Sequence, residues 1–289
     1  MNLTNINDIK NLLARHGFHF SKSLGQNFLT AAWVPRDIAD AAELTETTGV
    51  LEVGPGIGCL TAELSERAGK VVAVELDKAL KPVLAETLAG CDNVEIIFGD
   101  VLKQNLPELV REKFGESPVK VCANLPYNVT SPLITAFLQA GCFESITVMI
   151  QREVARRMCA KANTADYGAF TVLVQWYAEA EILFDVPPSC FIPQPKVTSS
   201  VIRLKTREKP PCEVKDEELF FRVVRAAFGM RRKTLLNALG ASFGEIGRER
   251  IAGVIENAGF TPQIRGEVLQ IGDFAKISDG FYELLHENL

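Results

Sequence analysis

The chain lacks long hydrophobic runs and any sign of an export signal. Its apolar stretch at residues 167–178 is far shorter than the ~20 residues that a membrane-spanning helix needs. The N-terminal residues alternate between polar and apolar types and lack the apolar centre of a signal peptide. These absences exclude a membrane-spanning protein, and we expect a cytoplasmic one.

Cysteine and histidine occur without the spacing of a metal or redox site. The seven cysteines are scattered, and no pair has the spacing of a zinc or dithiol motif. His16 and His19 lie three residues apart, but no third ligand is near them in the sequence. We therefore expect reduced, mostly buried thiols, a solvated terminal helix around the histidines, and no metal.

The charge is unevenly distributed along the 289 residues. The net charge is −5, which argues against a uniformly basic nucleic-acid-binding protein. Residues 196–234, however, contain eleven Lys and Arg against five acidic residues, so the rest of the chain is strongly acidic. This asymmetry indicates a positive patch that could attract a polyanion. A solvated helix face is the alternative explanation.

The first two thirds of the sequence alternate between short apolar runs and segments of helical periodicity. Continuous apolar strands separated by helices predict a parallel sheet that is covered on both faces. The expected strands are residues 50–53, 71–74, 94–98, 119–123 and 146–150. The expected helices are residues 60–68, 77–88, 132–139 and 151–161.

The pattern changes after residue 161. Residues 170–177, 180–186 and 199–204 are expected to be strands without intervening helices, which predicts an antiparallel edge. A polar linker at 206–211 precedes expected helices at 217–228, 233–239, 247–258 and 277–287. We predict an α/β domain at 1–206, including a helical N-terminal segment at 1–45, and a small all-helical domain at 207–289.

A glycine-rich loop follows the first expected strand and opens a helix. A dinucleotide-binding fingerprint requires glycine at its first, third and sixth positions. Gly54 and Gly56 fit, but Cys59 occupies the sixth position, and Pro55 removes one backbone N–H that a pyrophosphate would use. The spacing therefore favours S-adenosylmethionine over NAD. A tight strand–helix turn without a ligand is the alternative.

Polar residues follow the ends of the next expected strands. Glu75 suits a ribose diol, because one carboxylate can accept from two hydroxyl groups. Asp100 can accept from an adenine amine, and Val101 can flank the adenine ring. Any single acid could instead cap a helix. Parallel strands, however, bring their carboxyl ends to one rim, where open α/β sheets bind ligands.

The fourth expected strand ends in the tetrad Asn-Leu-Pro-Tyr at residues 124–127. Together with the glycine loop, Glu75 and Asp100, this tetrad resembles the adenine-N6 methyltransferases. Further matching segments lie at 26–29, 151–157, 187–199 and 231–235. The whole set resembles the ribosomal RNA adenine N6-dimethyltransferases, and among them the small-subunit enzymes, over nearly the full chain.

The resemblance implies a Rossmann-like class I methyltransferase with S-adenosyl-L-methionine as cofactor. It implies N6,N6-dimethylation of adenosines in 16S rRNA within a pre-30S small subunit and a role in subunit biogenesis. The sequence leaves the oligomeric state open, and we expect a monomer. It places Asn27 and Leu29 over the cofactor and makes Phe191 the second aromatic that sandwiches a flipped base. For Phe191, a core aromatic is the alternative.

The chemistry of the tetrad fits this activity on its own terms. Adenine N6 is a poor nucleophile because its lone pair is conjugated into the ring. The Asn124 oxygen and a backbone carbonyl of Leu125 or Pro126 could accept the two N6 hydrogens and free the lone pair. Pro126 stiffens the turn, and Tyr127 can stack on the base. The expected catalytic residues are therefore Asn124, Pro126 and Tyr127, to which the resemblance adds Phe191, and Asn124 also borders the cofactor.

The basic segment is the expected RNA contact. Arg222, Arg225, Arg232 and Lys233 would share one side of a continuous helix, although Gly229 could interrupt it. Arg231, Arg232 and Lys233 precede a helix start, where cations oppose the helix dipole and favour an anionic partner such as RNA phosphate. Lys22 is a further candidate for an RNA contact.

Other functions remain open at this point. A large-subunit rRNA methyltransferase has overlapping signatures, and a DNA adenine methyltransferase shares the tetrad. A ribosome assembly factor that docks on immature subunits belongs to a different class. A NAD oxidoreductase is opposed by Cys59 and by the tetrad.

Overall fold

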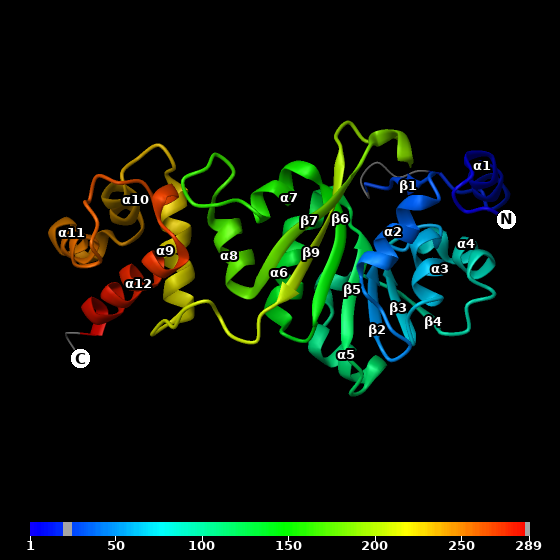
Figure 1. The fold of residues 1–289 in the computed structure, drawn as a ribbon, viewed down its shortest axis with the longest axis horizontal. Coiled ribbons are helices and arrows are strands. Elements are labelled where there is room, and N and C mark those ends of the chain that lie inside the picture. The colour runs from blue at the N-terminus through cyan, green and yellow to red at the C-terminus, as the bar shows by residue number, and fades with distance from the viewer. Residues whose placement is uncertain (20–24, 287–289) are drawn as a thin grey trace. The chain divides into compact units, whose positions relative to one another are not determined.

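The computed structural model describes residues 1–19 and 25–286, which form two compact units (Figure 1). The first unit comprises Met1–Ala155 and Ala178–Thr206. The second comprises Arg156–Tyr177 and Arg207–Leu289. Within the described residues, no helix is long and apolar enough to cross a membrane.

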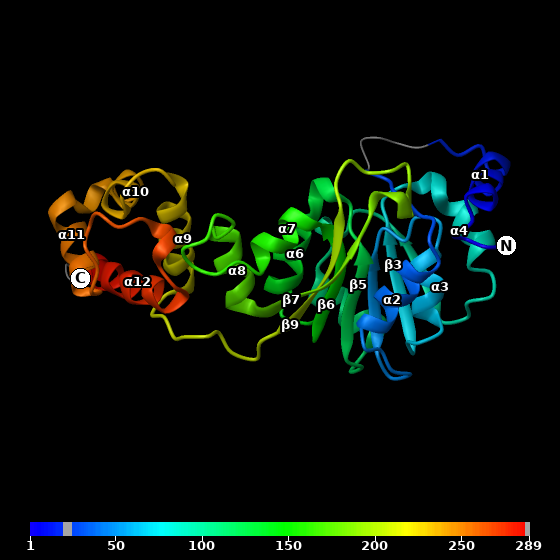
Figure 2. The ribbon, with the colours of Figure 1, turned by 45° about the horizontal axis from the view of Figure 1, so that its top comes forward.

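A seven-stranded sheet in the order β4-β3-β2-β5-β6-β9-β7 forms the centre of the first unit (Figure 2). The strands from β4 to β6 pair in parallel, and β9 pairs antiparallel with both β6 and β7. This confirms the predicted Rossmann-like sheet with an antiparallel edge. The strands are β2 (Gly49–Val53), β3 (Lys70–Glu75), β4 (Val94–Phe98), β5 (Val119–Asn124), β6 (Ser145–Gln151), β7 (Ala178–Val186) and β9 (Ser199–Thr206).

Helices accompany the strands as the periodicity predicts, because the central strands are buried along their length. Ile38 of α2 and Leu60 of α3 share a core cluster with Cys122 of β5. The helices are α1 (Ile6–Arg15), α2 (Trp33–Ala41), α3 (Cys59–Ser65), α4 (Lys81–Thr87), α5 (Leu106–Phe114), α6 (Thr130–Ala140) and α7 (Arg152–Met158). The sequence analysis missed α5, although Asn105 caps it and a proline lies in its first turn.

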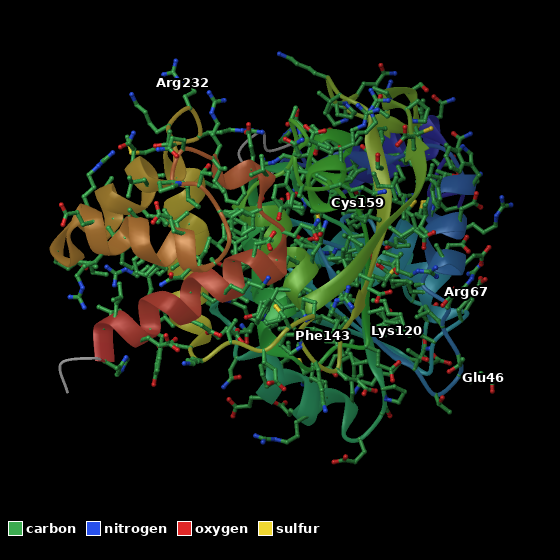
Figure 3. The ribbon with its side chains drawn as sticks, turned by 60° about the vertical axis from the view of Figure 1, so that its left-hand side comes forward. Glu46, Arg67, Lys120, Phe143, Cys159 and Arg232 are labelled. Carbon is green, nitrogen blue, oxygen red and sulfur yellow. The ribbon has the colours of Figure 1, made fainter. Side chains whose placement is uncertain are left out.

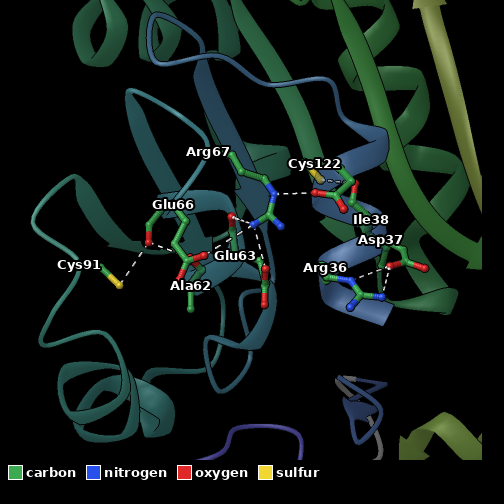
Figure 4. A network of polar contacts seen from close by, with 11 residues as sticks. Arg36, Asp37, Ile38, Ala62, Glu63, Glu66, Arg67, Cys91 and Cys122 are labelled. Atoms are coloured by element: carbon green, nitrogen blue, oxygen red, sulfur yellow. Dashed lines mark hydrogen bonds and ion pairs between the residues drawn. The ribbon is translucent and has the colours of Figure 1, made fainter. Parts of the chain in front are cut away.

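An arginine beyond the end of α3 connects α3 with α2 (Figure 4). The Arg67 Nε donates to Asp40 over 2.8 Å, and its Nη1 donates to the carbonyl and the carboxylate of Glu63. The Arg67 side chain is three-quarters buried. These bonds hold α3, the helix that the glycine loop opens, against α2.

A second, two-stranded sheet joins distant segments. In it β1 (Phe28–Leu29) pairs antiparallel with β8 (Phe191–Ile192). Strands this short have no periodicity of their own, so the sequence does not predict them. The pairing fixes the segment before α2 to the loop before β9.

The expected strand at 170–177 is wrong, because these residues form α8 (Ala169–Tyr177). The β-branched and aromatic residues suit a strand, but tertiary packing decides otherwise. Trp176 is buried and stacks on Phe220, with ring centroids 4.3 Å apart. Tyr177 stacks on Phe221. Residues 156–177 therefore belong to the second unit, whereas the predicted domain at 1–206 placed them in the first.

The second unit is helical throughout its described part. Besides α8 it contains α9 (Glu217–Gly229), α10 (Leu235–Ser242), α11 (Arg248–Asn257) and α12 (Ile271–His286). All four predicted C-terminal helices are present, although α12 begins six residues earlier than expected. Their apolar faces meet in one core that includes Trp176, Phe220 and Phe274.

Truncating Trp176 should destabilise the second unit. Trp176→Ala removes a fully buried indole, and large-to-small aromatic substitutions cost about 3–5 kcal/mol. Denaturant unfolding should show this loss. The control Trp33→Ala removes a half-buried indole from the first unit and should cost less. An unchanged unfolding midpoint for Trp176→Ala would contradict the packing described here.

Candidate functional site

A pocket opens at the carboxyl ends of the parallel strands. It is built by the loops that follow β2, β3, β4 and β5, together with residues 25–29. The parallel register brings these strand ends to one rim. The predicted residues that line the pocket are Asn27, Leu29, Gly54, Gly56, Glu75, Asp100, Val101, Asn124, Pro126 and Tyr127.

The glycine loop bends sharply into this pocket. Gly54 and Gly56 have φ of 70° and 60°, in the left-handed region that glycine adopts without strain. A Cβ on Gly56 would lie 3.1 Å from the Phe28 ring. The Gly54 N–H donates to the Val74 carbonyl of β3. Glycine at these positions therefore lets the backbone itself form the pocket wall.

Glu75 ties the end of β3 to the glycine loop. Its Oε2 accepts from the Gly56 N–H over 3.2 Å, and its Oε1 accepts from the Asp77 N–H over 2.7 Å. Burial raises the pKa of Glu75, while these two backbone donors oppose the rise. The carboxylate is 6% exposed and retains lone pairs for hydroxyl donors in the pocket.

Asp100 both caps a short helix and lines the pocket. Its Oδ1 accepts from the Leu102 N–H over 3.0 Å and so caps the 3-10 helix η3 (Val101–Lys103). Asp100 therefore caps a helix, as the alternative proposed, and also lines the pocket. Val101 is 6% exposed and lies against the same pocket.

The tetrad after β5 presents polar groups at the centre of the rim. The Asn124 Nδ2 donates to the Asn27 carbonyl over 3.4 Å, which leaves Oδ1 as the acceptor at the other end of the amide. The Pro126 carbonyl already accepts from the Thr130 hydroxyl and the Val129 N–H. Tyr127 begins the 3-10 helix η4 (Tyr127–Val129).

Two further hydrogen bonds fix residues 25–29, one within the segment and one to the loop after β3. The Asn27 Nδ2 donates to the Gly25 carbonyl over 2.9 Å. The Gln26 Nε2 donates to Asp77 over 2.7 Å, a contact that the sequence analysis did not foresee. Leu29 is 3% exposed and joins the core beneath.

Phe191 does not reach the pocket. It is 2% exposed and packs with Leu29, Met149 and Val201 in the core of the first unit. Its backbone pairs with Leu29 in the small sheet. Phe191 is therefore a core aromatic in this structure, which is the alternative given above. Its side chain is not placed to stack on a base in the pocket.

The basic residues do not share one helix. The prediction of a continuous helix is wrong, because α9 ends at Gly229 and Thr234 caps α10. Arg231, Arg232 and Lys233 instead form the loop between α9 and α10, directly before the start of α10. Arg232 points outward from this loop (Figure 3). Lys22 lies outside the described residues.

The five predicted RNA-binding cations are all exposed but differ in their partners. Arg222 lies over the Phe243 ring at 4.3 Å, and Arg231 contacts Glu267 and the Ala165 carbonyl. Within residues 1–19 and 25–286, the side chains of Arg225, Arg232 and Lys233 form no hydrogen bond or ion pair. These three cations are the ones available to an anionic partner.

Glu52 is a pocket residue that the sequence analysis overlooked. It is 1% exposed, lines the pocket, and its Oε2 has no hydrogen-bond partner among the described residues. Burial raises the pKa of Glu52 to about 8; the nearby Thr61 hydroxyl opposes this rise and Glu75 adds to it. The signal was available in the sequence, because Glu52 is the one charged residue in an otherwise apolar strand and lies two residues before the first glycine of the loop. A cation placed beside this carboxyl would favour its ionised form.

Glu52 should make stability depend on pH. Between about pH 4.5 and 8 the folded protein holds a proton on Glu52 that the unfolded chain has lost. Stability should therefore fall as the pH rises through this window, by up to about 1.4 kcal/mol per pH unit.

Glu52→Gln should remove the part of the pH dependence of stability that comes from Glu52. Denaturant unfolding at pH 5, 6, 7 and 8 should show a flatter decline for the variant than for the wild type. The exposed Glu46 provides a matched control, because Glu46→Gln should leave the slope unchanged. Parallel slopes for Glu52→Gln and the wild type would refute the assignment.

The fold and the pocket together define a class of protein. A mostly parallel sheet with a glycine loop after β2, an acid ending β3 and an Asn-Leu-Pro-Tyr tetrad after β5 is the arrangement of a Rossmann-like methyltransferase. A family model described as "Ribosomal RNA adenine dimethylase" matches residues 17–277. The chain belongs to this family of methyltransferases.

Relatives and solved structures agree with this membership. The chain is 49% identical over 279 residues to "Ribosomal RNA small subunit methyltransferase A" of Geobacillus thermodenitrificans, covering 95% of each chain. It is 48% identical to the protein of the same name from Clostridium perfringens, covering 96% of this chain and 97% of the relative.

Among solved structures, a dimethyladenosine transferase from Plasmodium falciparum is similar at a TM-score of 0.73. It is 25% identical, and the match covers 89% of this chain and 98% of that one. The 23S rRNA methyltransferase ErmE is similar at a TM-score of 0.66 and 29% identity, covering 88% and 98%.

Proposed function

We propose that this protein transfers methyl groups from S-adenosyl-L-methionine to N6 of adenosines in 16S rRNA of a pre-30S small subunit, forming N6,N6-dimethyladenosine. The observation that carries the proposal is the position of the Asn124 amide, which lines one pocket with the glycine loop and Glu75. The name shared by the bacterial relatives supports the choice of the small subunit. A ribosomal substrate would place the protein in the cytoplasm.

The pocket residues suit each part of this cofactor. Glu75 can accept from the ribose hydroxyls, while Asp100 can accept from the adenine amine and Val101 can contact the ring. Glu52 Oε2, which has no partner among the described residues, can accept from the ammonium of the methionine portion, and the positive charge of that group would favour ionisation of Glu52. When bound, the cofactor supplies a methyl group already activated by a positively charged sulfur. No strong base is then needed, and the protein's main contribution is positioning.

The tetrad would orient the attacking amine. Asn124 Oδ1 accepts one N6 hydrogen, because its amide nitrogen is committed to the Asn27 carbonyl. The Leu125 carbonyl is the better second acceptor, since the Pro126 carbonyl is already engaged. These two bonds draw N6 toward tetrahedral geometry and turn its lone pair toward the methyl group. The adenine leaves its stack to enter the pocket and packs against Tyr127.

The decisive experiment is methyl transfer to undermethylated small subunits with labelled cofactor, followed by mass mapping of the nucleosides. Wild-type protein should yield N6,N6-dimethyladenosine. Asn124→Ala should lower kcat by roughly 10²–10³-fold, the typical cost of losing one transition-state hydrogen bond, with a much smaller change in the cofactor Kd.

The exposed Asn7 provides the matched control, and Asn7→Ala should retain full activity. Absence of any methylated adenosine with the wild type would overturn the proposal. An Asn124→Ala variant that still transfers methyl groups at the normal rate would remove Asn124 from the mechanism. Asn124→Ala also tests the assembly-factor alternative, because a factor that only docks would function normally with this substitution.

The second unit would contact the RNA backbone. Arg225→Ala, Arg232→Ala and Lys233→Ala together should weaken RNA binding and reduce its salt dependence. The slope of log K against log salt should fall by roughly 0.7–0.9 for each phosphate that the variant no longer neutralises. Combined Lys10→Ala, Lys81→Ala and Arg111→Ala changes the charge equally at exposed sites of the first unit. If both triple variants shift the slope alike, the RNA is not bound through Arg225 of α9 and the loop between α9 and α10.

A further inference from the structure

A hydrogen bond links the tetrad to the antiparallel edge of the sheet. The Tyr127 hydroxyl and the Ser199 Oγ are 2.5 Å apart, and either group can donate. Tyr127 follows β5, whereas Ser199 is the first residue of β9, 72 positions later. The bond therefore connects two segments that only the folded sheet brings together.

Ser199 is a rigid anchor. It is fully buried, and its backbone lies between two neighbours, opposite Gln151 of β6 and Val186 of β7. A residue paired on both sides has little freedom to shift. The next residue, Ser200, bonds with equal length to Asp185.

Tyr127 has less support of its own. It lies in a one-turn 3-10 helix after a proline, and its ring is partly exposed to the pocket. The Pro126 backbone, with φ of −59°, fixes where the turn begins but not how the ring is rotated about its χ angles. The hydroxyl at the far end of the ring is the atom through which the orientation can be set.

The phenol is unsuited to proton transfer at neutral pH. Burial raises the pKa of Tyr127, and the bond to Ser199 opposes the rise only in part. The hydroxyl therefore remains protonated, and its hydrogen bond to Ser199 can fix the rotation of the ring.

We propose that Ser199 is a positioning residue that holds the Tyr127 ring beside Asn124 in the orientation required to stack the target adenine. This inference rests on the proposed function, because it assigns Tyr127 the contact with the base. Ser199 acts only through Tyr127 and does not line the pocket itself. The base-stacking surface is thereby set by a strand on the far side of β6.

The test is a double-mutant cycle with Ser199→Ala and Tyr127→Phe, assayed by methyl transfer to undermethylated small subunits. A neutral hydrogen bond is worth about 0.5–1.5 kcal/mol, so each variant should lower kcat about 2–10-fold. The double variant should be no slower than either single variant, because both remove the same bond. The cofactor Kd should stay at the wild-type value in all three.

Ser200→Ala is the matched control. Ser200 is equally buried in the same strand and loses a bond of the same length, but that bond leads to Asp185 and not to Tyr127. Ser200→Ala should change the thermal stability about as much as Ser199→Ala does, while its kcat stays at the wild-type value. If both serines had only a structural role, Ser199→Ala and Ser200→Ala would have the same effect on kcat.

The outcomes separate this inference from the proposed function. Multiplicative effects of the two substitutions, or equal kcat in Ser199→Ala and Ser200→Ala, overturn the role of Ser199 while the activity stands. An inactive wild type overturns the activity and the inference together. Should Ser199→Ala fail to fold, Tyr127→Phe alone decides, since an unchanged kcat would show that the hydroxyl positions nothing.

Discussion

The parallel pairing of β2 with β3 and β5 is the constraint on which the site depends. It aligns the three strand ends, so that the glycine loop, Glu75 and Asn124 emerge at one rim. Such pairing requires helices as crossovers, and these helices bury both faces of the sheet. Burial in turn keeps the strand ends rigid. The chemistry at the rim is therefore a consequence of how the core is packed.

Charge is organised differently in the two units. In the first, Glu52 and Glu75 are both buried, and the charge of Glu75 adds to the cost of ionising Glu52. A cation near Glu52, or a hydroxyl that donates to it, would lower this cost. In the second unit, Arg225, Arg232 and Lys233 lie in water at little cost, which suits contact with phosphates.

Polar contacts between distant segments complete the site. The Asn27 carbonyl orients the Asn124 amide, and Ser199 holds the Tyr127 hydroxyl. Neither partner belongs to the tetrad that carries the resemblance to adenine methyltransferases. The tetrad presents its polar groups at the rim of the sheet, while the contacts that orient them come from the segment before α2 and from the antiparallel edge strand.

Periodicity and turn chemistry are local properties, so the sequence alone predicted the strands of the large sheet, the helices between them other than α5, the glycine loop, and the polar residues at the strand ends. Only the tertiary structure decided that residues 169–177 form a helix, that Phe191 is buried, and that Glu52 Oε2 has no partner among the described residues. Trp176 illustrates the reason: its run favours a strand locally, but stacking on Phe220 outweighs that preference. The burial of a side chain and its hydrogen-bond partners depend on residues far away in the chain, so no local sequence pattern predicts them.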